Sequence, residues 1–355
     1  MTKTASLHIN LDAIRHNFNL VKQLAPKSKI LAMVKADAYG HGLIPVAKAL
    51  SNADGLAVAR LDEAITLRNH GIQKQIVLLG TLLSEQDVQY CAEYQLDVVI
   101  HNRESAQTFS KAPIAQPLTV WLKIDTGMHR LGVSPEEYGG IYSLLNNAEN
   151  TSEIINMTHF SCADEIDDPL TQSQLDCFNQ LTENTAKPKS AANSAALIRY
   201  PHSHFDWVRP GIMLYGADPL AEGSCLPLRQ AMSLTARVVA VRDLSEHEAV
   251  GYGCSWRADR PTRLATVGIG YGDGYPRHAP NGTPVLINQQ LATLAGRVSM
   301  DLITVDITDC TLVKVGDEVV LWNNQLKATE IARHAKTISY ELFTSITNRV
   351  ERQTG

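Results

Sequence analysis

The chain has 355 residues, of which 44% are hydrophobic and 19% are charged, and its formal net charge at pH 7 is -5. These proportions are typical of a protein that folds throughout, and the length favours one large domain with one smaller domain. The net negative charge argues against nucleic-acid binding, which needs a concentrated Lys and Arg surface, so we expect a small-molecule substrate.

No secretion or membrane signal is evident in the sequence. The N-terminal residues lack the apolar core of a signal peptide, and no stretch approaches the ~18 apolar residues of a membrane span. The six cysteines are scattered without the paired spacing of a zinc site, which indicates free thiols in a reducing compartment. We therefore expect a cytoplasmic protein with no metal and no membrane partner.

From Lys29 onward, short runs rich in Val, Ile and Leu alternate with amphipathic stretches of helical length, the pattern of βα units around a parallel sheet. The expected strands are Ile30–Lys35, Gly55–Ala59, Gln75–Leu79, Asp97–Ile100, Leu118–Ile124, Glu153–Phe160, a weak run at Ser190–Asn193, and Phe205–Arg209. The expected helices are Leu11–Leu24, Leu43–Leu50, Leu61–His70, Glu85–Tyr94, Arg103–Ser110, Pro135–Asn146, Leu170–Glu183 and Ala195–Tyr200. This count predicts a (β/α)8 TIM barrel, although the pattern alone also permits an open sheet.

The sequence changes in character after about Pro227, where turn-separated runs rich in β-branched residues indicate a mostly β domain. These runs are Ser233–Asp243, Arg263–Gly270, Pro284–Ile287, Gln290–Ala295, Leu302–Ile307 and Asp317–Leu321, followed by a helical piece at Lys327–Ala335. Gly, Ser and Pro collect in Ala221–Leu228, the expected linker. We therefore expect a barrel at residues 1–226 and a smaller, β-rich domain at residues 227–355.

The end of the first barrel strand contains a lysine in a chemically informative position. The active site of such a barrel lies at the C-terminal ends of its strands. Lys35 would be the last residue of its strand, where apolar neighbours lower the pKa of an amine and make it available to an aldehyde. By position alone, a solvent-facing lysine on a loop is the more frequent outcome.

The fifth run ends in the segment Trp121–Gly132, which contains Lys123 and Arg130. An arginine in a tight loop can make forked hydrogen bonds to a phenolate or a carboxylate. Lys123 could equally be an inward-facing lysine paired with an ordinary carboxylate.

The last three barrel runs also end in polar segments. His159 follows the sixth run with a cysteine three residues later, but no second pair of ligands accompanies them, so a metal site is not expected. Ser194 follows the seventh run and could bind a phosphate or cap the next helix. Arg209 ends the eighth run, just before Gly211 and Ile212, and the loops after strands seven and eight commonly bind phosphate.

Four tyrosine- or methionine-containing segments of the β-rich region are further candidates. They are Ala249–Trp256, Gly268–Tyr275, Gly296–Asp301 and Ser339–Leu342. Gly268–Tyr275 looks superficially like a dinucleotide-binding loop, but its glycine spacing is wrong and it lies in an all-β region.

These segments together resemble the alanine racemases, a family of fold-type III pyridoxal-phosphate enzymes, and the resemblance extends along nearly the full chain. It begins at Lys35–Gly42, which is similar to the family's cofactor-attachment segment. The resemblance implies that the chain binds pyridoxal 5'-phosphate through Lys35 and inverts the α-carbon of alanine. Inversion by two bases needs groups on opposite faces, and the resemblance supplies the second group as Tyr252 of a partner subunit. It therefore implies a homodimer with shared active sites.

The same resemblance implies roles for the other candidates. Arg130 would orient substrate and cofactor with the support of a carbamylated Lys123, and His159 would stack on the cofactor ring and contact Arg209. Arg209 would donate to the ring nitrogen yet leave it unprotonated, which favours racemisation over transamination. The residues that would bind the phosphate are Tyr39, Ser194, Gly211, Ile212 and Tyr340.

The resemblance also predicts a narrow substrate pocket. Met300 of the partner chain would border the substrate carboxylate, and Tyr271 would form a gate beside the substrate. Together with Tyr39 they would leave room for little beyond a methyl side chain, which favours alanine, although serine stays possible. In a bacterium the D-alanine would feed peptidoglycan synthesis. The segment Asn348–Arg352 departs from the family's usual arginine-proline ending.

Two other functions are compatible with this architecture. A pyridoxal-phosphate decarboxylase of basic amino acids would share the barrel and the β domain, but it would use a partner cysteine and an acidic group at the ring nitrogen. Tyr252 and Arg209 argue against it, and release of carbon dioxide from labelled lysine or ornithine would decide. A non-catalytic carrier of the cofactor would need no β domain. Chiral chromatography after incubation with L-alanine would distinguish such a carrier from a racemase.

Overall fold

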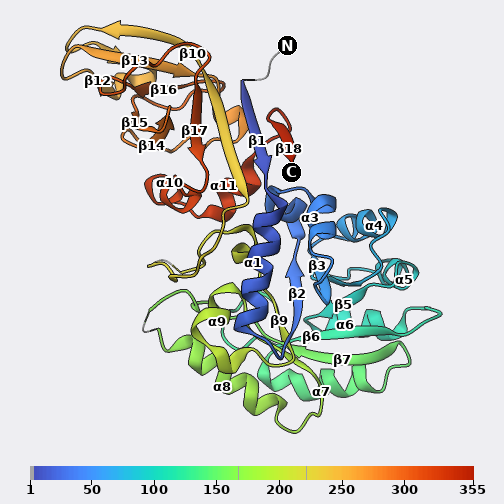
Figure 1. Cartoon of the computed structure of the whole chain (residues 1–355). Helices are drawn as coiled ribbons and strands as arrows, with labels where there is room; N and C mark the ends of the chain where they lie inside the picture. The colour runs from blue at the N-terminus through green and yellow to red at the C-terminus, as the bar shows by residue number, and fades with distance from the viewer. Residues whose placement is uncertain (1–3, 167, 221) are drawn as a thin grey trace.

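The computed structural model describes residues 4–166, 168–220 and 222–355. Figure 1 shows a parallel barrel, built mainly from the first two thirds of the chain, beneath an antiparallel sheet formed mainly by the last third. Among the described residues, no helix is long and apolar enough to cross a membrane.

Eight parallel strands form the barrel, which closes where the first of them, β2, pairs with the last, β9. The strands are β2 (Lys29–Met33), β3 (Gly55–Val58), β4 (Gln75–Leu78), β5 (Asp97–Ile100), β6 (Leu118–Lys123), β7 (Thr151–Met157), β8 (Lys189–Ser190) and β9 (Trp207–Val208). Most are short and continuously apolar because both faces of a parallel strand are covered. The predicted (β/α)8 barrel is confirmed.

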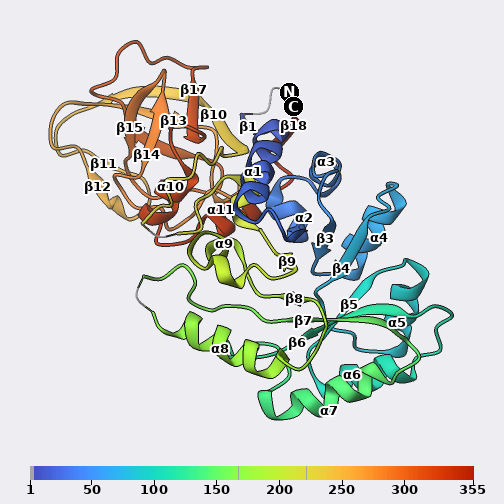
Figure 2. The ribbon, with the colours of Figure 1, turned by 60° about the horizontal axis from the view of Figure 1, so that its bottom comes forward.

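Helices lie outside the barrel, as Figure 2 shows for α6, α7 and α8 beside β6–β8. Their bounds are α1 (Leu11–Leu24), α3 (Leu43–Ala49), α4 (Leu61–Asn69), α5 (Glu85–Glu93), α6 (Arg103–Lys111), α7 (Pro135–Asn146), α8 (Leu170–Thr182) and α9 (Ser194–Arg199). Five of them begin at a side chain that accepts a hydrogen bond from a free backbone N–H of the first turn. These N-cap residues are Asn10, Ser84, Asn102, Ser134 and Asn193.

The second sheet is antiparallel apart from one pair and is wound around the long strand β10 (Met232–Leu244). Its further strands are β13 (Thr262–Val267), β14 (Pro284–Ile287), β15 (Gln290–Leu294), β16 (Ile303–Asp306), β17 (Glu318–Trp322) and β18 (Glu351–Thr354). A small hairpin, β11 (Ala249–Val250) with β12 (Trp256–Arg257), stands apart, and two short helices, α10 (Ala328–His334) and α11 (Ser339–Ser345), follow β17. The predicted smaller, mostly β C-terminal region is confirmed.

The first strand of the chain belongs to this second sheet. Strand β1 (Ala5–Ile9) pairs with β10 on one side and with β18 on the other, so the first and last strands of the chain lie side by side (Figure 1). The expected division at residues 226 and 227 stays a prediction. Strand β1 lies on the barrel side of this division in sequence, but it pairs with strands of the C-terminal sheet. Ala221, at the start of the expected linker, lies outside the described residues.

The structure corrects one placement that matters for the site. We expected Lys35 at the last position of its strand, but β2 ends at Met33. Lys35 instead begins the separate short segment α2 (Lys35–Gly40), where the chain turns away from the barrel wall.

Candidate active site

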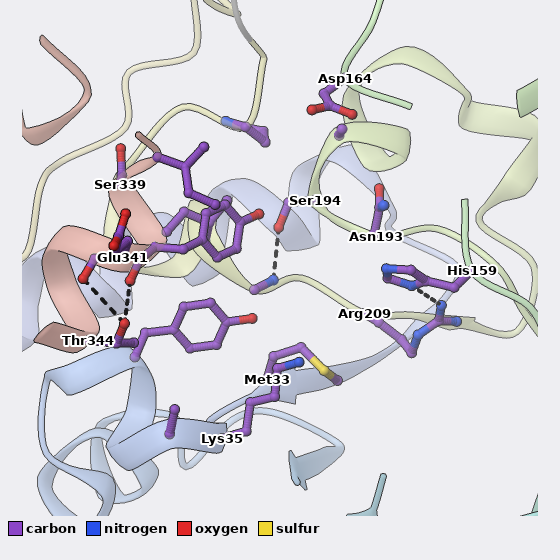
Figure 3. A pocket seen from close by; sticks show the side chains of 18 of the residues that line it. Met33, Lys35, His159, Asp164, Asn193, Ser194, Arg209, Ser339, Glu341 and Thr344 are labelled. Atoms are coloured by element: carbon purple, nitrogen blue, oxygen red, sulfur yellow. Dashed lines mark hydrogen bonds between the residues drawn. The ribbon is translucent and has the colours of Figure 1, made fainter. Parts of the chain in front are cut away.

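A cavity of about 940 Å3 opens at the C-terminal ends of the barrel strands, within the size range of small-molecule sites. Its wall includes α11 of the C-terminal region as well as the barrel loops (Figure 3). Ten of the candidate residues line it: Lys35, Tyr39, Lys123, Arg130, His159, Ser194, Arg209, Gly211, Ile212 and Tyr340. The barrel and α11 therefore bring together side chains that are up to 305 residues apart in sequence, Lys35 and Tyr340.

The turn that carries Lys35 has an uncommon backbone. The four residues after it, Ala36, Asp37, Ala38 and Tyr39, have φ values of 54°, 52°, 52° and 53°. This left-handed conformation costs L-residues roughly 1–2 kcal/mol each, so it persists only where the surrounding structure holds it. Burial and the nearby cation of Arg130 lower the pKa of Lys35, against the opposing effect of Glu63.

Tyr39 closes this turn against the barrel. Its ring stacks on Tyr215 with the centroids 4.8 Å apart, and its carbonyl lies 2.8 Å from His41 Nδ1. Burial and the neighbouring Tyr340 raise the pKa of Tyr39, so its hydroxyl keeps its proton and can donate a hydrogen bond. A Cβ atom on Gly211 would lie 2.6 Å from the Tyr39 hydroxyl, so only glycine permits this approach.

Ser194 does not cap its helix, contrary to one of the two interpretations of the sequence. Asn193 is the N-cap of α9, and its Oδ1 accepts a hydrogen bond from Ala196 N at 3.0 Å. The hydroxyl of Ser194 instead accepts from Gly211 N at 2.8 Å, which joins the loops after the last two barrel strands (Figure 3). Gly211, Ser194 and the following residue Ile212 thus lie together beside Tyr39.

Arg209 lies buried at the floor of the cavity and is fixed by its terminal nitrogens. Nη1 donates to Ser190 Oγ at 2.7 Å, and Nη2 donates to the Thr158 carbonyl at 2.6 Å and the Ala191 carbonyl at 3.2 Å. Nη2 also donates to His159 Nδ1 at 3.3 Å (Figure 3). Nε donates to no other described residue. Burial lowers the pKa of Arg209 only to about 10, so it stays a cation at neutral pH.

The contact with Arg209 also determines the state of His159. Arginine can only donate, so His159 Nδ1 accepts, and the proton of the neutral ring is on Nε2. Burial, followed by the cations of Arg209 and Lys123, lowers the pKa of His159 well below its usual range. His159 is therefore neutral at pH 7.

The end of β6 and the loop after it add two more basic side chains to the cavity, Lys123 and Arg130. Asp125 Oδ1 accepts hydrogen bonds from three successive backbone N–H groups, those of Gly127, Met128 and His129, each at 3.0 Å, and this shapes the loop that carries Arg130. Burial and the cations of Arg209, Arg130 and Lys35 lower the pKa of Lys123 to about 8. Lys35, Lys123, Arg130 and Arg209 thus give the cavity a group of basic side chains suited to an anionic ligand, although Asp164, Asp218 and Glu341 also line it.

Three candidates of the C-terminal region do not line this cavity. Tyr252, Tyr271 and Met300 are exposed by 70%, 40% and 54%. The last two lie on adjoining loops, because Tyr271 N donates to the Ser299 carbonyl at 3.0 Å and Gly272 N donates to that of Met300 at 2.8 Å.

The exposed loops are joined to one another by two arginines. Gly253, beside Tyr252, packs on the guanidinium of Arg297. Arg349 joins the other two loops through ion pairs with Asp273 at 3.3 Å and Asp301 at 2.5 Å. These three side chains therefore lie exposed on loops that contact one another, and they do not line the cavity of their own chain.

Sequence reasoning missed several residues that hold the site. Asn193 caps α9, Ser190 accepts a hydrogen bond from Arg209, and Tyr215 donates one to the Met33 carbonyl at the end of β2. Arg349 contacts the exposed loops of Tyr271 and Met300, and Arg352 contacts the turn after Lys35. An asparagine before a short apolar helical run is a usable N-cap signal, so Asn193 could have been recognised. The contacts of the two C-terminal arginines span dozens to hundreds of residues, and no local pattern indicates them.

Comparison with known proteins is consistent along the whole chain. The protein-family model described as "Alanine racemase, N-terminal domain" matches residues 9–219. The family model described as "Alanine racemase, C-terminal domain" matches residues 231–354. The alanine racemase of Vibrio cholerae is 45% identical over 352 residues, 98% of each chain, and that of Aeromonas hydrophila is 46% identical over 351 residues, again 98% of each. The crystal structure of the biosynthetic alanine racemase from Pseudomonas aeruginosa superimposes with a TM-score of 0.97 at 44% identity, and it covers all of both chains.

Proposed function

Since the chain belongs to the alanine racemase family, we propose that it interconverts L-alanine and D-alanine with pyridoxal 5'-phosphate as its cofactor. The observation that carries this proposal is the convergence of Lys35, whose pKa is lowered, and the buried cation Arg209 in one cavity. An enzyme of this family is an isomerase, and alanine is its substrate.

The residues present fit a planar aldehyde that bears a phosphate. Gly211 leaves the Tyr39 hydroxyl a space that a Cβ would fill, and the hydroxyl of Ser194 lies beside it. We assign the phosphate to Tyr39, Ser194, Gly211, Ile212 and Tyr340. When bound through Lys35, the cofactor would supply an electron-withdrawing ring that acidifies the α-hydrogen of the amino acid.

Two groups of the protein would move the proton at the α-carbon. Lys35 would serve one face of the substrate, because its lowered pKa raises the fraction of neutral amine that can accept a proton. Tyr252 of the partner subunit would serve the other face. Its exposure of 70% in the single chain supports this role, since a buried tyrosine could not enter a neighbouring cavity.

Arg209 and His159 would set the outcome of the reaction. Nε of Arg209 remains available for the cofactor ring nitrogen, and an arginine cation can donate there without giving up its proton. The ring is then a weaker electron sink, which disfavours protonation at the cofactor carbon and the resulting transamination. Neutral His159 would stack on the ring.

Arg130 would orient the substrate carboxylate with Met300 and Tyr271 of the partner subunit. Lys123 has a pKa of about 8, so a substantial fraction of its amine is neutral near pH 8 and can react with carbon dioxide. We propose that Lys123 is carbamylated, because the carbamate anion would offset the surrounding cations and hold Arg130.

The shared site further implies a homodimer. We also propose a cytoplasmic location, which the six free cysteines support, and a role of the D-alanine in peptidoglycan synthesis.

Racemisation and hydrogen exchange test the function together. The protein loaded with pyridoxal phosphate should convert L-alanine to the racemate, as measured by chiral chromatography. In deuterium oxide, Tyr252→Phe should lose racemisation at least about 100-fold, while it still exchanges the α-hydrogen of one enantiomer through Lys35. Full racemisation by this variant, or carbon dioxide release from lysine in place of alanine racemisation, would contradict the proposal.

A further inference from the structure

The left-handed turn after Lys35 is held firmly on its inner side. Tyr39 stacks on Tyr215, and Gly40 packs so closely on the carbonyl of Phe343 in α11 that no Cβ would fit between them. The outer side has fewer partners, because Ala36 and Asp37 are exposed. What holds the outer side therefore decides whether the turn keeps its disfavoured conformation.

The carboxylate of Asp37 is the centre of the outer contacts. Its Oδ1 accepts from Leu43 N at 2.7 Å, which closes the turn onto the start of α3. Its Oδ2 accepts from Arg352 Nη1 at 2.6 Å, which connects the turn to a residue 315 positions later in the chain. Asp37 N also donates to Glu63 Oε1 at a longer 3.3 Å.

Arg352 is itself held in place from the C-terminal sheet. It lies on β18, opposite Leu7 of β1, and the backbone of the last residue, Gly355, bonds to Ile9 and Leu11 at 3.0 and 2.9 Å. Its second nitrogen, Nη2, donates to the Ile346 carbonyl at 3.2 Å. Both terminal nitrogens of the Arg352 guanidinium thus have fixed partners, a geometry that the point charge of a lysine reproduces poorly.

We propose that Arg352 is a positioning residue for Lys35. It holds the left-handed turn from outside through Asp37, two residues beyond the lysine, and so keeps the Lys35 amine in the cavity. Arg352 does not reach the cavity lining. This inference rests on the proposed function, in which Lys35 binds the cofactor and moves a proton.

Substitution of Arg352 with a matched control tests the inference. Arg260 also has an ion pair of 2.6 Å, with Asp309, but on an exposed loop of the C-terminal region, so Arg260→Gln removes a comparable pair away from the turn. Arg352→Gln should lower kcat by about 10- to 100-fold, as expected for a displaced reacting group, with little change in KM for alanine. The kcat of Arg352→Lys should lie between those of Arg352→Gln and the unaltered protein. The kcat of Arg260→Gln should match that of the unaltered protein.

A second readout does not depend on turnover. The rate at which the apoprotein forms a borohydride-reducible bond to pyridoxal phosphate at Lys35, followed by peptide mapping, should fall about tenfold in Arg352→Gln and stay unchanged in Arg260→Gln. The thermal unfolding midpoints of the two variants should be similar. A general loss of stability in Arg352→Gln would instead lower its unfolding midpoint below that of Arg260→Gln.

Asp37→Asn removes the same ion pair from the other side. If the pair acts as a unit, the double variant Asp37→Asn/Arg352→Gln should be no slower than the more impaired single variant. Additive losses, or equal attachment rates in Arg352→Gln and Arg260→Gln, would overturn the positioning role while leaving the proposed function intact. Labelling of a residue other than Lys35 in the unaltered protein would instead overturn the proposed function.

Discussion

Lys35 shares its cavity with the basic side chains of Lys123, Arg130, Arg209 and Arg333. Like charges disfavour the protonated amine, and burial acts in the same direction. The pKa of Lys35 is therefore lowered first by burial and then by Arg130, with Glu63 opposing. Each residue here affects the chemistry through the protonation of its neighbours as well as through its own contacts.

This charge coupling predicts a pH effect of a single substitution. Only the neutral amine of Lys35 attacks an aldehyde, so attachment of pyridoxal phosphate to the apoprotein should rise with pH and have its midpoint below the 10.5 of an ordinary lysine. Arg130→Gln removes a cation that lowers the pKa, so the midpoint should move to higher pH.

The measurement is the attachment rate as a function of pH, followed by absorbance. Arg103→Gln is the matched control, because Arg103 pairs with Glu137 at 3.6 Å on the outer helices and leaves the cavity unchanged. A midpoint in Arg130→Gln that is unchanged, or lower than that of the control, would show that Arg130 does not set the protonation of Lys35.

At the scale of elements, the site depends on how closely the loops after β2 and β9 approach each other. Gly211 follows β9 and packs against Tyr39 of α2. A Cβ atom on Gly211 would lie 2.6 Å from the Tyr39 hydroxyl. Gly211→Ala should push these two segments apart and weaken cofactor binding at least about tenfold, or ~1.4 kcal/mol.

Equilibrium dialysis of pyridoxal phosphate measures this effect directly. Gly139→Ala is the control, since Gly139 lies in α7 with nothing within 4 Å of an added Cβ, and alanine is a better helix former than glycine. Equal cofactor affinity in both variants would mean that the Gly211–Tyr39 contact does not support the phosphate site.

The sequence predicted several elements of both regions well because their signals are local. Helices α1 and α7 begin and end where their apolar period and flanking residues indicate, and β5 and β14 match the expected strands. Strands β1 and β18 were missed because their hydrogen-bonding partners lie hundreds of residues away. The α2 turn was also missed, since its left-handed backbone is held by tertiary contacts and not by the propensities of its residues.

At the scale of the whole molecule, the candidate site divides into two groups. The group predicted at the strand ends meets in one cavity, because a barrel gathers the C-terminal ends of its strands. The group of Tyr252, Tyr271 and Met300 lies exposed on the C-terminal region. Local motifs identified both groups, whereas the contacts through Arg349 and Arg352 depend on the assembled fold.

In the proposed mechanism, a second chain supplies the exposed group to the cavity. A cyclic pair of chains would place the exposed group of each subunit over the cavity of the other, and both sites would then be equivalent. Two inactive variants can therefore complement each other. A dimer of Lys35→Ala with Tyr252→Phe has one site with both defects and one site with neither.

The most direct measurement is the alanine racemase activity of mixed chains. Lys35→Ala and Tyr252→Phe, each inactive alone, are unfolded together, refolded and assayed, with size-exclusion chromatography to verify dimers. Random pairing should restore about one quarter of the unaltered activity, since about half of the dimers are mixed and each has one intact site. Mixed dimers without activity would contradict a site that combines Lys35 of one chain with Tyr252 of the other.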